Sequence, residues 1–90
     1  MLINETRELI LIEKYTYTKE NINPNNITEI TLSKVTTNIL NNISSYYEVF
    51  RQMSNSMARC FTYTTLEEAE EQFKYLRNMA LRKNGIKEED

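Results

Sequence analysis

The feature that most constrains the fold of this 90-residue chain is a helix start at Thr65. Glu68 follows three residues later, which is the spacing of a capping box: the threonine hydroxyl accepts from a free backbone N–H, and the carboxylate returns to the N–H of the cap. Apolar residues then recur at intervals of three and four, in the stripe Leu66, Ala69, Phe73, Leu76 and Ala80. The last third of the chain is therefore predicted to be one amphipathic helix.

The two ends of this helix carry matching signals. Glutamates crowd its first turns and Arg82 and Lys83 close it, an order that complements the helix macrodipole. Gly85, the single glycine, indicates a stop just past the helix. We expect Phe73 and Leu76 to anchor the helix, residues 84–90 to form a frayed acidic tail, and residues 1–90 to make a single domain.

The residues before the helix are typical of strands. Residues 8–18, ELILIEKYTYT, alternate with period two, which sets Leu9, Leu11, Tyr15 and Tyr17 on one side. Asparagines around the single proline then reverse the chain, and residues 27–35 supply a second strand. Two aromatic and β-branched runs, 46–52 and 58–64, flank the turn SNS and predict a hairpin over 45–64. The sequence therefore predicts an α+β domain in which a small antiparallel sheet, in the order ββββα, packs on one C-terminal amphipathic helix.

The middle of the chain also allows a different interpretation. A set of apolar residues falls on one side at helical spacing: Leu32, Val35, Ile39, Ile43, Tyr46, Phe50, Met53 and Met57. A helix over 33–54 would change the order to ββαβα within the same α+β class. The β-branched and cap-preferring clusters TTN, NN and SS oppose such a helix, because each of these residues lowers helix propensity. Both orders stay open at this point.

The residue types exclude most catalytic and metal chemistry. The chain has no histidine, its one aspartate is the terminal Asp90, and its one glycine cannot form a phosphate-binding loop. Cys60 lies in an apolar run and is expected to be a small core residue rather than a reactive thiol. We therefore predict no catalytic residue, no cofactor-binding residue and no metal ligand, and we expect no enzymatic activity.

Charge and hydropathy limit the partners and the compartment. The net charge is −2 and the pI is near 5.2, and no cluster of lysine and arginine suited to phosphate contacts is present, so nucleic acid is an unlikely partner. No apolar stretch reaches the length of a membrane span, and acidic residues stand where a secretory signal would be basic. A single cysteine agrees with a reducing compartment, so the cytoplasm is expected and a membrane is not.

The tyrosines indicate a protein interface, because this side chain gives large contact area at little entropic cost. Both sides of the first strand are partly apolar and one helix covers only one of them. We expect Tyr15 and Tyr17, with Tyr47 and Phe61, to meet another protein or a second copy of the chain. The resulting hypothesis is a small non-catalytic interaction protein, homo-oligomeric, for instance a phage- or mobile-element-encoded inhibitor of a host system. An oligomer that sequesters a nucleotide in a tyrosine-lined pocket and a single-stranded nucleic-acid binder are the alternatives.

Overall fold

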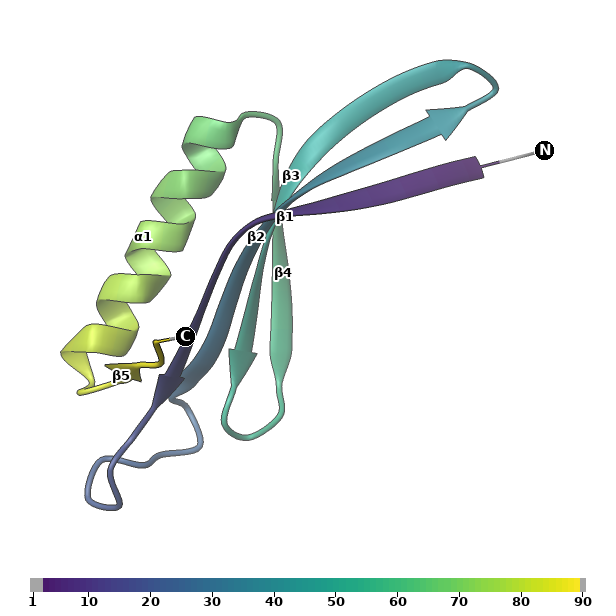
Figure 1. Cartoon of the computed structure of the whole chain (residues 1–90). Coiled ribbons are helices and arrows are strands. Elements are labelled where there is room, and N and C mark those ends of the chain that lie inside the picture. Colours follow the sequence, from purple (N-terminus) through teal and green to yellow (C-terminus); the bar gives the residue numbers. More distant parts are fainter. Residues whose placement is uncertain (1–2, 90) are drawn as a thin grey trace.

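A five-stranded antiparallel sheet and one helix make up the computed structural model, which describes residues 3–89 (Figure 1). The elements in chain order are β1 (Ile3–Thr16), β2 (Ile27–Ile39), β3 (Asn42–Met53), β4 (Ala58–Tyr63), α1 (Leu66–Arg82) and β5 (Ile86–Lys87). In the sheet the strands lie in the order β4-β3-β2-β1-β5. The predicted α+β class is confirmed, and so is the hairpin over 45–64, because β3 and β4 pair antiparallel.

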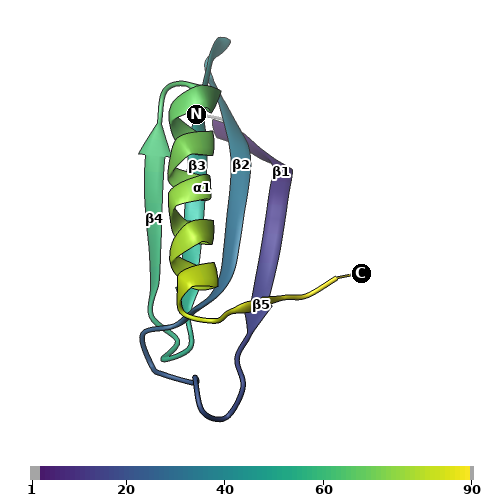
Figure 2. The same ribbon diagram turned by 90° about the vertical axis from the view of Figure 1, so that its left-hand side faces the viewer.

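Helix α1 covers one face of the sheet and lies over β2 and β3, between β4 and β1 (Figure 2). Four residues of the predicted stripe are fully buried: Ala69, Phe73, Leu76 and Ala80. They pack against Ile30 and Leu32 of β2 and Val49 of β3. The expectation that Phe73 and Leu76 anchor the helix to the sheet agrees with this packing.

Both ends of α1 are capped by side chain and backbone. The Thr65 hydroxyl accepts from the N–H of Glu68 at 3.3 Å and donates to the Glu68 carboxylate at 2.8 Å, so the carboxylate binds the hydroxyl rather than the N–H of the cap. At the other end Asn84, with φ 67°, takes the left-handed position expected of the glycine. Gly85 donates its N–H to Ala80 O at 2.9 Å, and a Cβ there would lie 2.7 Å from the same oxygen. Residue 85 must therefore be glycine, because the Cβ of any other residue would collide with the carbonyl oxygen of Ala80.

The helix considered for 33–54 is wrong, because β2 and β3 form a long hairpin over this range. Leu40 and Asn41 make its turn with φ values of 51° and 69°, the left-handed pair found in tight hairpins. Leu32 and Val35 are both buried, but their backbone separation of three residues places them on opposite faces of the sheet. The apparent helical stripe therefore combines residues from both faces of the sheet.

A β-bulge divides β1. Leu9 pairs with Ser33, whereas Leu11 pairs with Leu32. The chain therefore advances by two residues in β1 while it advances by one in β2, so β1 contains one extra residue here. Because neighbouring residues of β2 point to opposite faces, Leu9 and Leu11 also lie on opposite faces. The expectation from period two that they share a side is wrong.

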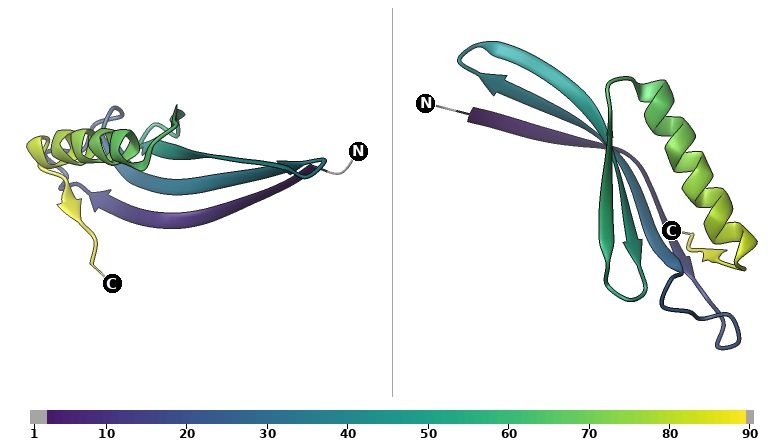
Figure 3. Two further views of the ribbon diagram at one scale, coloured as in Figure 1. Left: turned by 90° about the horizontal axis from the view of Figure 1, so that it is seen from above. Right: turned by 180° about the vertical axis from the view of Figure 1, so that it is seen from behind.

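Beyond the end of β4 the sheet continues as a three-stranded arm. The arm consists of residues 3–7 of β1 and 35–46 of the β2–β3 hairpin, and it bends away from α1 (Figures 1 and 3). It gives the molecule principal extents of 53 × 24 × 23 Å and a radius of gyration of 15.2 Å. A compact chain of this length would have a radius of gyration of about 12 Å. The side of the sheet that α1 leaves open lies on the inside of this bend.

The C-terminal segment returns to the sheet. Ile86 and Lys87 pair with Thr16 and Tyr15 of β1, and the N–H of Glu88 donates to Lys14 O at 2.8 Å. The expected fraying of residues 84–90 is therefore wrong for these paired residues. The short strand shields the end of β1, while the outer edge of β1 from residue 3 to residue 13 has no neighbouring strand among the described residues.

Candidate functional site

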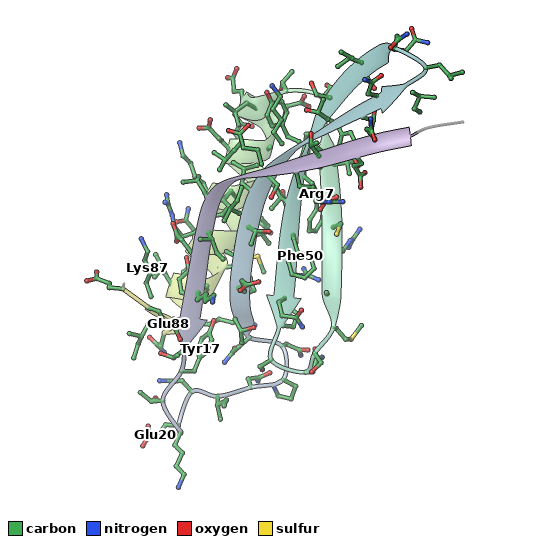
Figure 4. The ribbon with its side chains drawn as sticks, turned by 45° about the vertical axis from the view of Figure 1, so that its right-hand side comes forward. Arg7, Tyr17, Glu20, Phe50, Lys87 and Glu88 are labelled. Atoms are coloured by element: carbon green, nitrogen blue, oxygen red, sulfur yellow. The ribbon has the colours of Figure 1, made fainter. Side chains whose placement is uncertain are left out.

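The face of the sheet opposite α1, which we call the open face, carries a row of four paired residues. Ile12 pairs with Thr31, Thr31 with Phe50, and Phe50 with Cys60, so the row crosses β1, β2, β3 and β4 on one side. Figure 4 views this face, with α1 behind the sheet and Phe50 on the near side. Ile12 is 45% exposed, and Leu9, in the next row, is 56% exposed. A solvated sheet face is normally polar, so these apolar residues indicate a surface that is covered in use.

One ion pair spans the upper end of the open face, near the bend. Arg7 Nη1 lies 2.6 Å from Glu48 Oε1, and the pair joins β1 to β3 across β2. The hydrogen bond with Glu48 raises the pKa of Arg7 above its ordinary value. Val35, which pairs with Arg7, is fully buried although it lies outside the cluster beneath α1. Arg7 is therefore engaged within the chain, and so is Lys14 on the same face, whose Nζ lies 3.9 Å from Glu29 Oε1.

The four aromatic residues proposed from the sequence as an interface lie on the helix side. Tyr15 is 3% exposed and belongs to the core, and Tyr17, Tyr47 and Phe61 are partly buried against it. Burial raises the pKa of the Tyr15 phenol, helped by the hydrogen bond to Glu13, and burial likewise raises the pKa of Tyr17, whose hydroxyl donates to Ile27 O at 2.7 Å. The expectation that Tyr15 is exposed is wrong, because α1 covers this side of β1. Whether a partner touches the partly exposed edges of the other three stays a prediction.

A buried carboxylate joins three elements beside Tyr15. Glu13 accepts from the Tyr15 hydroxyl, and its Oε2 lies 3.7 Å from Arg77 Nη1 and 3.9 Å from Lys87 Nζ. These partners come from β1, α1 and β5 respectively. Because every charge in the cluster has a partner within the chain, its role is to hold α1 and the C-terminal segment against β1.

Two arginines stand together on the helix side of the sheet. Arg51 and Arg59 are directly opposite each other on β3 and β4, and their guanidinium carbons lie 5.9 and 4.8 Å from the centre of the Phe61 ring. This is the geometry of cation–π contacts. The two charges lie on the face away from Phe50, so the open face gains no cationic groove of the kind that single-stranded nucleic acid requires.

A hollow at the end of β4 is the nearest approach to a tyrosine-lined pocket. Tyr46, Thr62, Tyr63 and Thr64 line it, and its volume is about 230 Å³. Sites for small organic ligands usually measure about 300 to 1,000 Å³ and enclose most of the ligand. The hollow is therefore small for a nucleotide.

Cys60 is exposed at the β4 end of the row on the open face, so the expectation that it is a core residue is wrong. The sequence signal that we missed is the position of Cys60 on β4, a short edge strand. Thr62, two residues after Cys60 on the same strand, is also exposed. Among residues 3–89 no group of three potential metal-ligating side chains comes together. The same part of the chain contains no helix long and apolar enough to cross a membrane.

Comparison with known proteins gives no relative on which to base a function. No family model, no curated protein and no solved structure matches the chain. The open face, whose apolar residues include Leu9, Ile12 and Phe50, is the surface feature that bears on function.

Proposed function

We propose that this protein is a non-catalytic interaction module that binds a protein surface through the open face. The observation that carries the proposal is the exposure of Ile12 and Leu9 on the open face, beside the half-buried Phe50, on the inner side of the bend (Figure 1). Contact with a partner removes such side chains from water, which stabilises the complex by roughly 25 cal/mol per Å² of apolar surface. The absence of histidine from the sequence supports a function by binding rather than by catalysis.

The composition of the open face also favours a protein over other partners. Threonine, serine and glutamine alternate with the apolar residues, so a partner's polar groups can be hydrogen-bonded at the rim. Arg7 is paired with Glu48 and Lys14 with Glu29, so neither cation of this face is without an acidic partner in the chain. The hollow beside Tyr46 is too small to favour nucleotide sequestration.

A photoreactive side chain at position 50 tests this proposal. Phe50 is replaced by benzoylphenylalanine, and a matched variant carries the same group at Lys74, which is exposed on the outer side of α1. Each variant is irradiated as purified protein and after mixing with an extract of the cells that make it. We expect discrete protein adducts from position 50 in at least one of the two solutions and none from position 74. No adduct from position 50 in either solution, or equal adducts from both positions, would refute the proposal.

A further inference from the structure

The tip of the arm exposes three large aliphatic side chains at a point where nothing in the described chain covers them. Leu40 is 68% exposed, Ile43 is 71% exposed, and Ile39 beside them is also exposed. The hairpin that carries them, residues 35–46, contains no charged residue. Covering this hairpin therefore desolvates no charge, and the gain is the apolar surface removed from water.

Leu40 is also an unfavourable choice for its backbone position. Its φ of 51° is left-handed, and the first residue of such a turn is usually asparagine, aspartate or glycine. A β-carbon costs roughly 1–2 kcal/mol in this conformation. Neither the turn nor the core of the chain gains from the leucine side chain, so its benefit comes from outside the chain.

The exposed surface of the chain is larger than its mass requires. Its accessible surface is 6404 Å² for 10.7 kDa, whereas a compact monomer of this mass exposes about 5,500 Å². The excess of about 900 Å² is close to the ~800 Å² that each partner buries in an interface of standard size. The arm and the open face together thus offer the area that one stable contact needs.

We propose that the partner of the open face is a second copy of this chain, and that the two copies exchange arms. In this two-fold dimer the tip of each arm rests on the row Ile12–Thr31–Phe50–Cys60 of the other copy through Ile39 and Leu40. Ile43 pairs with Asn38 and therefore lies on the other side of the arm from Ile39. The inference rests on the proposed function, since it uses the same open face, and it names the partner. A reciprocal contact covers Ile39, Leu40 and the row in both chains and closes the assembly at two copies.

The positions of the tip and the row suit such a dimer. Along β2, Val35 at the base of the arm is four residues from Thr31 and five from Leu40, or about 13 and about 17 Å of strand. The tip and the row therefore lie at similar distances on either side of the bend. In the single chain α1 lies on the outer side of the bend (Figure 3). In the proposed dimer, a two-fold axis facing the bend brings each tip over the other chain's row and leaves both helices on the outside.

Cross-linking between the tip and the row gives the first test. Cys60 is the single cysteine and lies in the row, so Leu40→Cys adds a thiol at the tip alone. The matched control is Ile22→Cys, because Ile22 is 65% exposed but lies in the loop at the opposite end of the molecule. With a short bismaleimide we expect Leu40→Cys to give a covalent dimer in which mass spectrometry joins position 40 of one chain to Cys60 of the other. Cross-linking no greater than that of Ile22→Cys and of wild type would overturn the arm exchange.

Mass in solution gives the second test, with Leu40→Asn compared with Ile22→Asn by sedimentation equilibrium. Asparagine suits the left-handed turn, so Leu40→Asn should keep the circular dichroism spectrum of the folded chain. The dissociation constant of its dimer should rise at least tenfold. Ile22→Asn should stay dimeric like wild type. A wild-type chain that is monomeric at every concentration overturns the inference. If photo-adducts from position 50 then appear only with cell extract, the proposed function stands and the partner is a different protein.

Discussion

Replacing Phe73 by alanine tests whether the helix-covered face is the core on which the open face depends. Phe73 is 1% exposed at the centre of the buried stripe of α1 and packs in the cluster with Ile30 and Leu32 of β2. Fully burying a phenylalanine side chain is worth about 1.5–3 kcal/mol, and truncation to a methyl group loses most of this transfer free energy. The cavity left in a core that relaxes only partly raises the expected loss to about 3–5 kcal/mol.

The size of this loss can be compared with the whole stability of the chain. At roughly 0.05–0.15 kcal/mol per residue, 90 residues give a free energy of unfolding of about 5–14 kcal/mol. Urea unfolding followed by circular dichroism measures the change, at one fixed protein concentration because self-association adds to apparent stability. Tyr75→Ala is the control, since Tyr75 is exposed on the same helix and its loss should stay within about 0.5 kcal/mol. A loss below about 1 kcal/mol for Phe73→Ala, or one equal to that of Tyr75→Ala, would show that this stripe is not the core.

Three further predictions concern the helix side of the sheet. The raised pKa of the Tyr15 phenol means that the folded chain keeps a proton that the unfolded chain loses near pH 10, so stability is complete below that pH and falls above it. Thermal melts across this range should show the fall, and Tyr15→Phe should weaken it; a midpoint constant with pH would contradict the assignment. Glu13→Ala leaves the buried Tyr15 hydroxyl unpaired and should cost about 1–3 kcal/mol by urea unfolding, and most of that cost should vanish in the Tyr15→Phe background. Gly85→Ala should cost about 1–3 kcal/mol, because its Cβ would meet Ala80 O at 2.7 Å; an unchanged urea midpoint would show that the helix end adjusts freely.

The elements with strong local signals could be predicted from the sequence. Thr65 and Glu68 fix the start of α1, and the apolar spacing fixes the side that packs. The turn between β3 and β4 follows from the strand-forming runs on either side of it. These signals act between residues that are close in the sequence. Contacts between distant parts of the chain agree with them, so the predicted helix and turn are the ones observed.

The features that sequence reasoning missed depend on pairing between strands. The bulge in β1 reverses the face of Leu9 relative to Leu11, and no composition signal marks it, since the region lacks glycine. The turn at Leu40 also lacks glycine, which made a continuous helix conceivable. Tyr15 looked exposed because only the path of α1 across the sheet decides which side of the first strand is covered.

For the same reason the sequence did not show that the aromatic residues predicted as an interface lie on the helix side of the sheet. Alternation along β1 separates two sets of residues but does not say which set faces the helix. Phe50 and Cys60 belong to the open face because they pair with each other and, through Thr31, with Ile12. That row exists only in the folded sheet, so a single sequence carries no direct sign of it.

The rate at which Cys60 is alkylated tests the central claim most directly, because this single thiol lies in the row on the open face. The rate is measured with a fixed excess of iodoacetamide, over a dilution series of the purified protein and in dilute protein mixed with cell extract. If a protein surface covers the open face, alkylation slows as the protein concentration rises, or on mixing with extract, and Leu40→Asn keeps the fast rate as the purified protein is concentrated. An equally fast rate in every solution would show that no protein covers the open face, and would contradict the account.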